Sequence, residues 1–462
     1  MKARTLFRAL MFVCCGVCPS LSAATEPTAA EPTATEPAAA EVSVEPPAKA
    51  VAPIANEEAL ELSNADSFSN EDPAEVEQQR RLDLYGFADL TYTKLLIPES
   101  NPWTRIYYPS NSFAVGNFNL YLSANLGDRW RALGEVRFMY LPNGATKTDT
   151  ATGEVKRTDT TVLDYAGFEQ PIHWGAIRIE RLWVEHEFST LFKLQVGAFL
   201  TPYGIWNVDH GSPAIVGIRA PLAVVSELFP AHQTGIQLYG NAFFDPIEVG
   251  YHVTLSNGRG PVEYEDFDED KAIGGRLYLK TDAVGSLTVG ASAYRGGYYD
   301  RSAKYVVSNG GSVVDQEYTT ISKYQEFSFG TDLKWQWKHW LVQGEYIMND
   351  AAFETHGRPR VDALKPPQGF QPDYRRWGAY GLVGYRTHFL QTMPYAVIQY
   401  VYAPNDPVVP PVLGGQVGLN IRPTPAVVLK LELSLTHFDG PGSTGLGNHP
   451  LRFLATQVAW AF

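Results

Sequence analysis

The side chains that could do chemistry lie mostly in one acidic run and one long apolar segment of this 462-residue chain. Residues 263–270 read E-Y-E-D-F-D-E-D, in which Asp266, Asp268 and Asp270 have the odd-position spacing of a calcium-binding loop. Such a loop also needs glycine at its sixth position and glutamate at its twelfth, and the sixth position counted from Asp266 is Lys271. The run therefore predicts a solvated outer loop, and we expect no metal site.

Catalytic chemistry has little support in the sequence. The chain has 10 histidines, and neither a nucleophile elbow nor a zinc-binding helix motif accompanies them. His186, His252 and His388 lie in stretches of alternating polarity, where the expected role is that of a wall residue. We therefore expect no enzyme, no catalytic residues and no cofactor.

The long apolar segment is Thr201 to Ala231, which contains S-P-A-I-V-G-I-R-A-P-L-A-V-V-S-E-L-F-P-A. Apolar residues do not favour a loop in water, and long connections are usually functional. We expect the segment to fold into the interior of a barrel, with a short helix within Pro221 to Phe229. An alternative is that it covers the barrel mouth or attaches to a neighbouring subunit. Its candidate constriction residues are Asp209, His210, Arg219 and Glu227.

Strands are the elements that must position these residues. In Phe113 to Leu126 every second residue is apolar, and the residues between them are mostly polar, which predicts a β-strand. Trp130 to Leu141 follows the same pattern after a short turn. Further strands are expected near 82–95, 176–188, 191–200, 232–244, 247–257, 272–282, 286–298, 324–338, 340–352, 376–389, 394–403, 413–423, 426–438 and 451–462. The total of about sixteen predicts an all-β fold, a transmembrane antiparallel β-barrel.

The connections between these strands alternate in length. Ser189-Thr190 and Thr424-Pro425 are tight turns, whereas 142–175, 299–323 and 353–375 are long. Short turns on one side and long loops on the other are typical of bacterial barrels, and a soluble sandwich or propeller does not explain them. After the N-terminal region no apolar run reaches the ~18 residues of a membrane-spanning helix. About sixteen strands also leave a water-filled lumen.

The same alternation predicts which charges line the lumen. The main basic candidates are Arg131, Arg137, Arg181, Lys193, Arg276 and Lys280. The other charges assigned to the lumen are Glu135, Glu185, Glu187, Asp332, Lys334, Arg386, Arg422, Lys430 and Glu432. The expected wall is therefore mixed in sign, with a modest basic excess.

The last strand, 451–462, carries an apolar row ending in Trp460 and Phe462. This row makes sense if it faces lipid and the strand closes a barrel, with both aromatic residues in an interfacial girdle. A strand of alternating apolar residues that ends in phenylalanine resembles the last strand of bacterial outer-membrane barrels. The end of that strand resembles the signal that the barrel assembly machinery reads. The alternative is a soluble C-terminal strand.

The N-terminal region has two different parts. Residues 1–24 have a basic start, an apolar core and the small residues Ser22-Ala23-Ala24, which predict a cleaved secretory signal peptide. All three cysteines lie inside it, and Val17 before Cys18 disfavours a lipoprotein. Residues 25–81 are rich in proline, alanine and glutamate, which predicts a disordered acidic linker in the periplasm. It is either a solvated leader or a partner-binding arm, and the barrel domain is expected over 82–462.

Two segments around the long loop carry a family resemblance. Val196 to Ile205 reads V-G-A-F-L-T-P-Y-G-I, and His232 to Gly240 reads H-Q-T-G-I-Q-L-Y-G. Together they resemble the phosphate-selective porin O/P family, in which G-x-F-x-x-P-F/Y-G leads into a long inward loop and a returning strand. The matching residues are Gly197, Phe199, Pro202, Tyr203 and Gly204. The resemblance implies a sixteen-stranded channel and a homotrimer.

These observations lead to one expected function and one alternative. We expect an outer-membrane porin of a Gram-negative bacterium, with a water-filled channel for passive diffusion of small hydrophilic solutes or ions, anions among them. Its partners would be outer-membrane lipids, the solutes, the barrel assembly machinery and copies of itself, and no nucleic acid. The alternative is a structural outer-membrane anchor that displays the acidic arm in the periplasm and has a closed lumen.

The composition of residues 25–80 predicts that this segment is dispensable for insertion. A variant that joins the signal peptide directly to Arg81 should reach the outer membrane at the parent's level, because the expected assembly signal lies at the other end. Membrane fractionation with a test of heat-modifiable migration measures this. Loss of assembly at equal expression would contradict the prediction.

Overall fold

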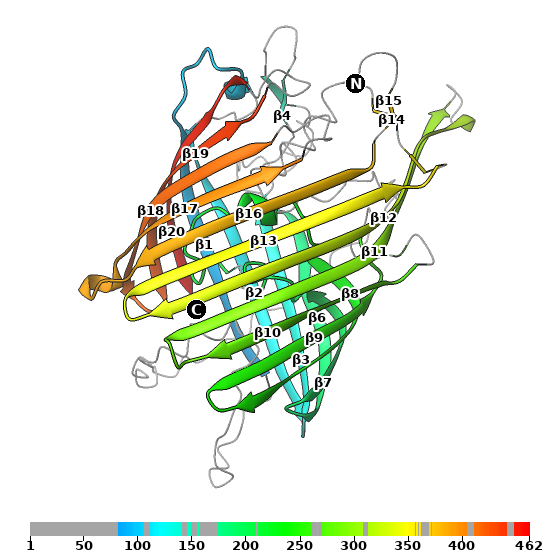
Figure 1. Cartoon of the computed structure of the whole chain (residues 1–462). Coiled ribbons are helices and arrows are strands. Elements are labelled where there is room, and N and C mark those ends of the chain that lie inside the picture. Colours follow the sequence, from blue (N-terminus) through cyan, green and yellow to red (C-terminus); the bar gives the residue numbers. More distant parts are fainter. Residues whose placement is uncertain are drawn as a thin grey trace, which may run out of the picture.

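The computed structural model describes most of the chain from Leu82 to Phe462 (Figure 1). The described part omits 106–110, 141–145, 149–154, 158–173, 209–210, 261–265, 267–269, 308–312, 356, 359, 362–368, 371, 404–410 and 441–447. The predicted signal peptide (1–24) and acidic linker (25–81) lie outside the described residues, and β1 begins at Leu82.

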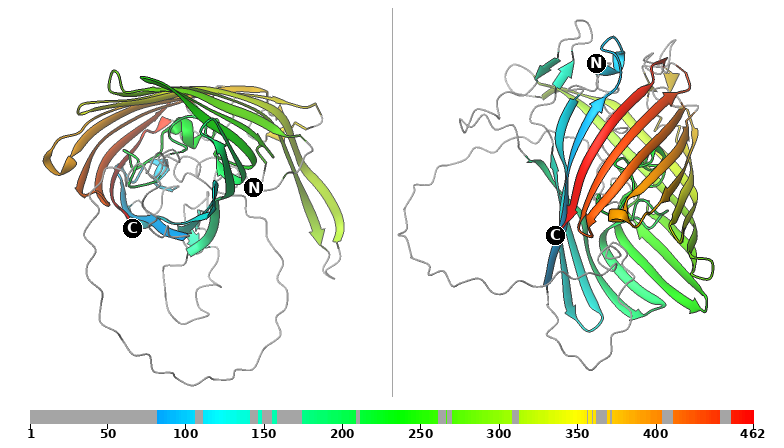
Figure 2. Two further views of the ribbon diagram at one scale, coloured as in Figure 1. Left: turned by 90° about the horizontal axis from the view of Figure 1, so that it is seen from below. Right: turned by 90° about the vertical axis from the view of Figure 1, so that its left-hand side faces the viewer.

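Sixteen antiparallel strands form one closed barrel, which confirms the predicted fold class (Figures 1 and 2). In ring order they are β1 (Leu82–Leu95), β2 (Asn111–Gly127), β3 (Trp130–Tyr140), β6 (Trp174–Ser189), β7 (Phe192–Leu200), β8 (His232–Phe244), β9 (Ile247–Ser256), β10 (Ala272–Thr281), β11 (Ser286–Val307), β12 (Val313–Trp337), β13 (Trp340–Phe353), β16 (Tyr374–Tyr385), β17 (Met393–Tyr402), β18 (Val412–Thr424), β19 (Val427–Phe438) and β20 (Leu451–Ala461). Each strand pairs with its neighbours in sequence, as hairpins with short turns dictate.

The ring closes between the first and last strands. β1 pairs with β20 from Phe87↔Ala461 to Leu95↔Phe453. The register continues beyond β20, because Gly86 N donates to Phe462 O at 2.9 Å and Phe462 N donates to Gly86 O at 3.0 Å. With this seam paired, the barrel has no open sheet edge, which is the condition for a sheet in a hydrocarbon layer.

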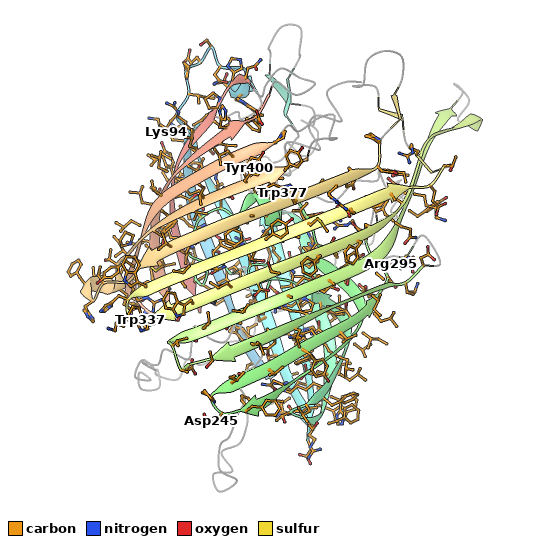
Figure 3. All side chains as sticks on the ribbon, viewed as in Figure 1. Lys94, Asp245, Arg295, Trp337, Trp377 and Tyr400 are labelled. Carbon is orange, nitrogen blue, oxygen red and sulfur yellow. The ribbon has the colours of Figure 1, made fainter. Side chains whose placement is uncertain are left out.

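The two faces of the barrel wall differ in polarity. On β19 the outward Leu429, Leu431 and Leu433 are exposed, whereas the inward Lys430 and Glu432 are buried. Aromatic side chains lie at both ends of this apolar surface, and Figure 3 shows Trp377 and Tyr400 toward one end and Trp337 toward the other. An apolar exterior with aromatic girdles and a polar interior defines a transmembrane β-barrel.

The remaining elements are short. Two small hairpins lie outside the ring: β4 (Thr146–Thr148) with β5 (Val155–Arg157), and β14 (Arg360–Val361) with β15 (Gly369–Phe370). Two 3₁₀ turns span Pro102–Arg105 (η2) and Phe389–Gln391 (η3), and α2 is a four-residue helix at Leu222–Val225. In the described part of the chain no helix has the length and apolarity to cross a membrane.

Two predicted boundaries are wrong. The connection expected at 299–323 is mostly strand, since β11 and β12 pair out to Val307 and Val313. Beyond the membrane both faces of a hairpin meet water, so apolar alternation no longer marks the strand. β16 ends at Tyr385 rather than near 389, because Arg386 N donates to His339 O and η3 follows. Arg386 therefore lies in a turn rather than on the wall.

We predict that Phe462→Ala assembles poorly in the cell but refolds well in vitro. Phe462 is 54% exposed, and its ring lies 6.0 Å from that of Phe118 between centroids, so loss of the ring should cost roughly 1–2 kcal/mol. The backbone hydrogen bonds to Gly86 do not need the ring. Heat-modifiable migration after refolding into detergent should match the parent, whereas outer-membrane fractionation should show a large loss. Equal small losses in both assays would mean that the ring acts only by packing.

Candidate functional site: the loop inside the barrel

The connection between β7 and β8, residues 201–231, is closed at its base by hydrogen bonds. Thr201 N donates to Ala231 O at 3.0 Å. The side-chain amide of Asn207 donates to both Thr201 O and Ala231 O at 2.9 Å. The chain therefore leaves and re-enters the wall at one point, and the residues between form one long loop.

The glycine that follows Tyr203 allows the chain to turn inward. Gly204 has φ +75°, and a Cβ there would lie 2.0 Å from Glu345 Oε2. Only glycine combines this conformation with this approach. The turn brings Trp206 N to within 2.8 Å of Glu345 Oε1, to which it donates. The segment that carried the family resemblance thus has a structural role at the entry to the loop.

Tyr203 fixes the first part of the loop against the wall. Its hydroxyl shares a hydrogen bond of 2.6 Å with Thr254 on β9, and its ring lies 5.0 Å from that of Phe229 and 5.9 Å from that of Tyr294. Burial raises the pKa of the Tyr203 hydroxyl above its ordinary value, although the bond to Thr254 opposes the shift. The hydroxyl therefore stays neutral and acts as an anchor.

Lys430 holds the middle of the loop. Its buried ammonium group on β19 donates to three loop carbonyls, those of Ser212 at 2.7 Å, Ile215 at 2.7 Å and Gly217 at 2.9 Å. The Ser212 hydroxyl donates to the buried Asp89 carboxylate on β1 at 2.5 Å. A single cation thus satisfies three backbone acceptors that no secondary structure satisfies.

The last part of the loop contacts the wall strands β12, β16 and β17. Leu222 N donates to Gln399 Oε1 on β17 at 2.7 Å, and Ser328 Oγ on β12 donates to Leu228 O at 2.6 Å. Ala223 packs on Gly378 of β16, where a Cβ would lie 2.8 Å from that of Ala223. The wall therefore presents a glycine where Ala223 of α2 packs against it.

These contacts show that the loop crosses the lumen. Ser212 contacts β1, and Gly204 N donates to Ser292 Oγ on β11 at 3.3 Å. β1 is the first and β11 the ninth of sixteen strands in the ring, so they lie on opposite sides. Figure 2 shows this green segment inside the ring seen end-on. The expectation of an inward-folded loop is confirmed, and the four-residue α2 lies within the range predicted for a short helix.

Of the four candidate constriction residues, the two that the structure describes, Arg219 and Glu227, do not lie together. Asp209 and His210 lie outside the described residues. Arg219 lies over the Phe453 ring of β20, with its guanidinium carbon 4.0 Å from the ring centroid. Glu227 pairs with Arg259 of the β9–β10 connection at 3.5 Å. The two described members therefore attach to different sides of the ring.

Arg259 is a residue that the sequence did not point to. Its Nε donates to Glu326 Oε1 at 2.9 Å, and its Nη2 donates to Glu227 O at 2.9 Å. Burial acts to lower the pKa of Arg259, but the Glu326 carboxylate outweighs it and holds the pKa well above the ordinary value. A permanent cation therefore ties this end of the loop to β12.

The six candidate wall residues all lie on inward positions of their strands. Five of them pair with acidic residues: Arg131 with Glu185, Arg137 with Glu180 at 3.2 Å, Arg181 with Glu135 at 2.5 Å, Lys193 with Glu187 at 3.8 Å and Arg276 with Asp332 at 2.6 Å. Lys280 is exposed on the same face of β10 as Arg276. Four of these pairs involve β3, β6 and β7, so the charged wall lies mainly on one side of the lumen.

Several anchors of the loop were missed at the level of sequence. Asp89, Glu326 and Glu345 are buried acids on inward strand positions that bind the loop or its anchor. The feature of the sequence that could have revealed them is an acidic residue on the inward-facing row of a predicted strand. Which loop group each one meets depends on the path of the loop. Within the described ranges, no group of three or more His, Cys, Asp or Glu residues could hold a metal ion.

Comparison with known proteins identifies no family for this chain. No protein-family model matches the sequence, and no curated protein matches it. Similar solved structures include OmpT, an outer membrane protein of Vibrio cholerae, with 12% identity over 82% of this chain and 99% of that one, at a TM-score of 0.48. The anion-selective porin from Comamonas acidovorans has 10% identity, the same coverage and a TM-score of 0.48. The outer membrane channel DcaP of Acinetobacter baumannii has 11% identity over 82% and 97%, at 0.45.

We predict that Lys430→Met releases the middle of the loop while the barrel stays closed. Three buried carbonyls would lose their donor, and each unsatisfied group costs roughly 1–3 kcal/mol. Amide hydrogen exchange over 211–220 should therefore accelerate by about tenfold or more. Lys280→Met removes an exposed lysine outside the loop contacts and should leave this exchange unchanged. Unchanged protection in Lys430→Met would show that the wall holds the loop without this residue.

Proposed function

We propose that the chain is an outer-membrane porin that lets small hydrophilic solutes or ions diffuse passively through a water-filled channel narrowed by residues 201–231. The observation that carries this proposal is the combination of an apolar exterior, a closed ring and a polar interior crossed by one anchored loop. A closed sixteen-stranded ring is wide enough to hold water beside such a loop.

The diffusion path would run between the loop and the charged wall of β3, β6 and β7. The middle and end of the loop bind β1, β12, β17 and β19. The charged wall carries four ion pairs of adjacent strands instead. Paired charges keep a wall hydrated without a large net field, which suits passage of small polar solutes.

The relative exposure of the basic and acidic members of these ion pairs supports a modest preference for anions. The side chains of Arg131, Arg137 and Arg181 are 25%, 18% and 18% exposed, whereas their acidic partners are at most 1% exposed. Lys193 and Glu187 show the opposite order, at 13% and 32%. A solute beside this wall would therefore meet more positive than negative charge. Asp209, His210, Arg219 and Glu227 remain candidates for the constriction.

The proposed family, oligomeric state, route of assembly, location and periplasmic tether rest on the sequence. Gly197, Phe199, Pro202, Tyr203 and Gly204 support membership of a phosphate-selective porin O/P-like family, and with it a homotrimer. The C-terminal strand supports recognition by the barrel assembly machinery and a location among outer-membrane lipids. The signal peptide and the acidic composition of 25–81 support a tether on the periplasmic side.

We predict that the purified protein forms conducting, weakly anion-selective channels in planar lipid bilayers. Single-channel recording in a potassium chloride gradient should give a reversal potential of the anion sign. A stable, folded protein without conductance would favour the structural anchor with a closed lumen. A cation-selective reversal potential would contradict the charge argument but leave the channel in place.

Deleting residues 206–226 should raise the single-channel conductance by about twofold or more, because the lumen of a sixteen-stranded ring is wide without the loop. Removing 303–317, at the end of the β11–β12 hairpin, is the matched control. That hairpin extends beyond the barrel rim in Figure 1, so its loss should leave conductance unchanged. Equal conductance of the parent and the 206–226 deletion would contradict a narrowing role.

A further inference from the structure

A second basic surface lies away from the charged wall of β3, β6 and β7. A pocket of about 90 Å³ opens between the loop and the inward face of β12, β13, β17 and β18. Its lining consists of Trp206, Ala214, Ile215, Val216, Lys334, Gln336, Leu341, Gln343, Arg386, Gln391, Met393, Asn420 and Arg422. The strand residues among them lie near the short turns, so the pocket faces the periplasmic end of the proposed channel.

The pocket has an apolar floor and a polar rim. Trp206, Leu341 and Met393 are buried and belong to one apolar cluster, on which Ile215 and Val216 pack. Gln336, Arg386 and Gln391 are exposed at the rim. A ligand that enters from this end would place an apolar portion against the floor and a polar group at the rim.

The charge of the lining has one sign. Lys334, Arg386 and Arg422 are cationic, and none of the described residues that line the pocket is acidic. Arg422 Nη2 donates to Pro213 O at 2.5 Å, but its Nη1 is buried without a hydrogen-bond partner. Arg386 and Arg422 line the same pocket, so their like charges repel each other. An anion between them would relieve this repulsion and accept from the unpartnered nitrogen.

We propose that this pocket binds small organic anions that combine one carboxylate with an apolar ring. The carboxylate would lie between the guanidinium groups of Arg386 and Arg422, and the ring against Trp206 and Leu341. Inorganic phosphate and acetate carry charge but nothing to cover the apolar floor, so they would bind far more weakly. The pocket's place beside a diffusion path rests on the proposed channel function, but its binding chemistry does not.

Calorimetric titration of the full, detergent-purified protein with sodium benzoate tests this directly. Benzoate should give a saturable signal, and acetate and phosphate at the same concentrations should not. Arg386→Gln should weaken benzoate binding by about tenfold, as expected for loss of a charge-assisted partner. Arg386 is the better variant because Arg422 also anchors the loop. Lys338→Gln is the matched control, since Lys338 lies at the same end but over the outward-facing Trp337 ring.

Each outcome decides the proposal. Saturable benzoate binding that is weakened in Arg386→Gln and kept in Lys338→Gln supports it. It is overturned by absence of benzoate binding to the folded parent, by equal binding of acetate or phosphate, or by undiminished binding in Arg386→Gln. Bilayer recording separates it from the proposed function. A conducting parent that does not bind benzoate overturns only the pocket, and a non-conducting parent that binds it overturns only the channel.

Discussion

Closure of the backbone hydrogen-bond ring is the constraint on which the rest of the structure depends. In hydrocarbon an unpaired N–H or C=O group costs several kcal/mol, so the first and last strands must meet. The pairing of β1 with β20, extended by the two bonds between Gly86 and Phe462, meets this requirement. Once the seam is closed, alternation along each strand sends one row of side chains to lipid and the other to the lumen.

The same requirement governs the loop inside the barrel. Among the described residues of the loop only the four of α2 form a helix, so many of its backbone polar groups need partners outside the loop. The wall supplies the partners from inward strand positions, with Lys430 for three carbonyls, Glu345 for Trp206 N and Gln399 for Leu222 N. Buried charges are tolerated here because each has several partners. The inward-facing polar residues of the wall therefore also serve as the anchors of the loop.

Distribution of charge within the lumen explains how one barrel can present two different surfaces. On the wall of β3, β6 and β7, Arg131, Arg137 and Arg181 each form an ion pair with a more deeply buried acid. The surface that faces the lumen there is therefore weakly positive. On the other side, Arg386 and Arg422 meet an apolar floor that the loop residue Trp206 helps to build. The first arrangement suits passage of hydrated solutes, and the second suits retention of an amphiphilic anion.

The sequence by itself determined the features that follow a fixed period. Alternation in segments such as 113–126 and 451–462 gave the strands, their faces and the ring of sixteen, because lipid selects apolar residues at every second position. It could not mark most of 299–323 as strand, since a hairpin that extends beyond the barrel rim has no lipid-facing row to impose the alternation (Figure 1). Only the tertiary structure decided the partners of the loop, such as Asp89 for Ser212 and Lys430 for three carbonyls. Those pairs join residues more than a hundred positions apart, and no local pattern encodes which inward side chain an irregular segment will meet.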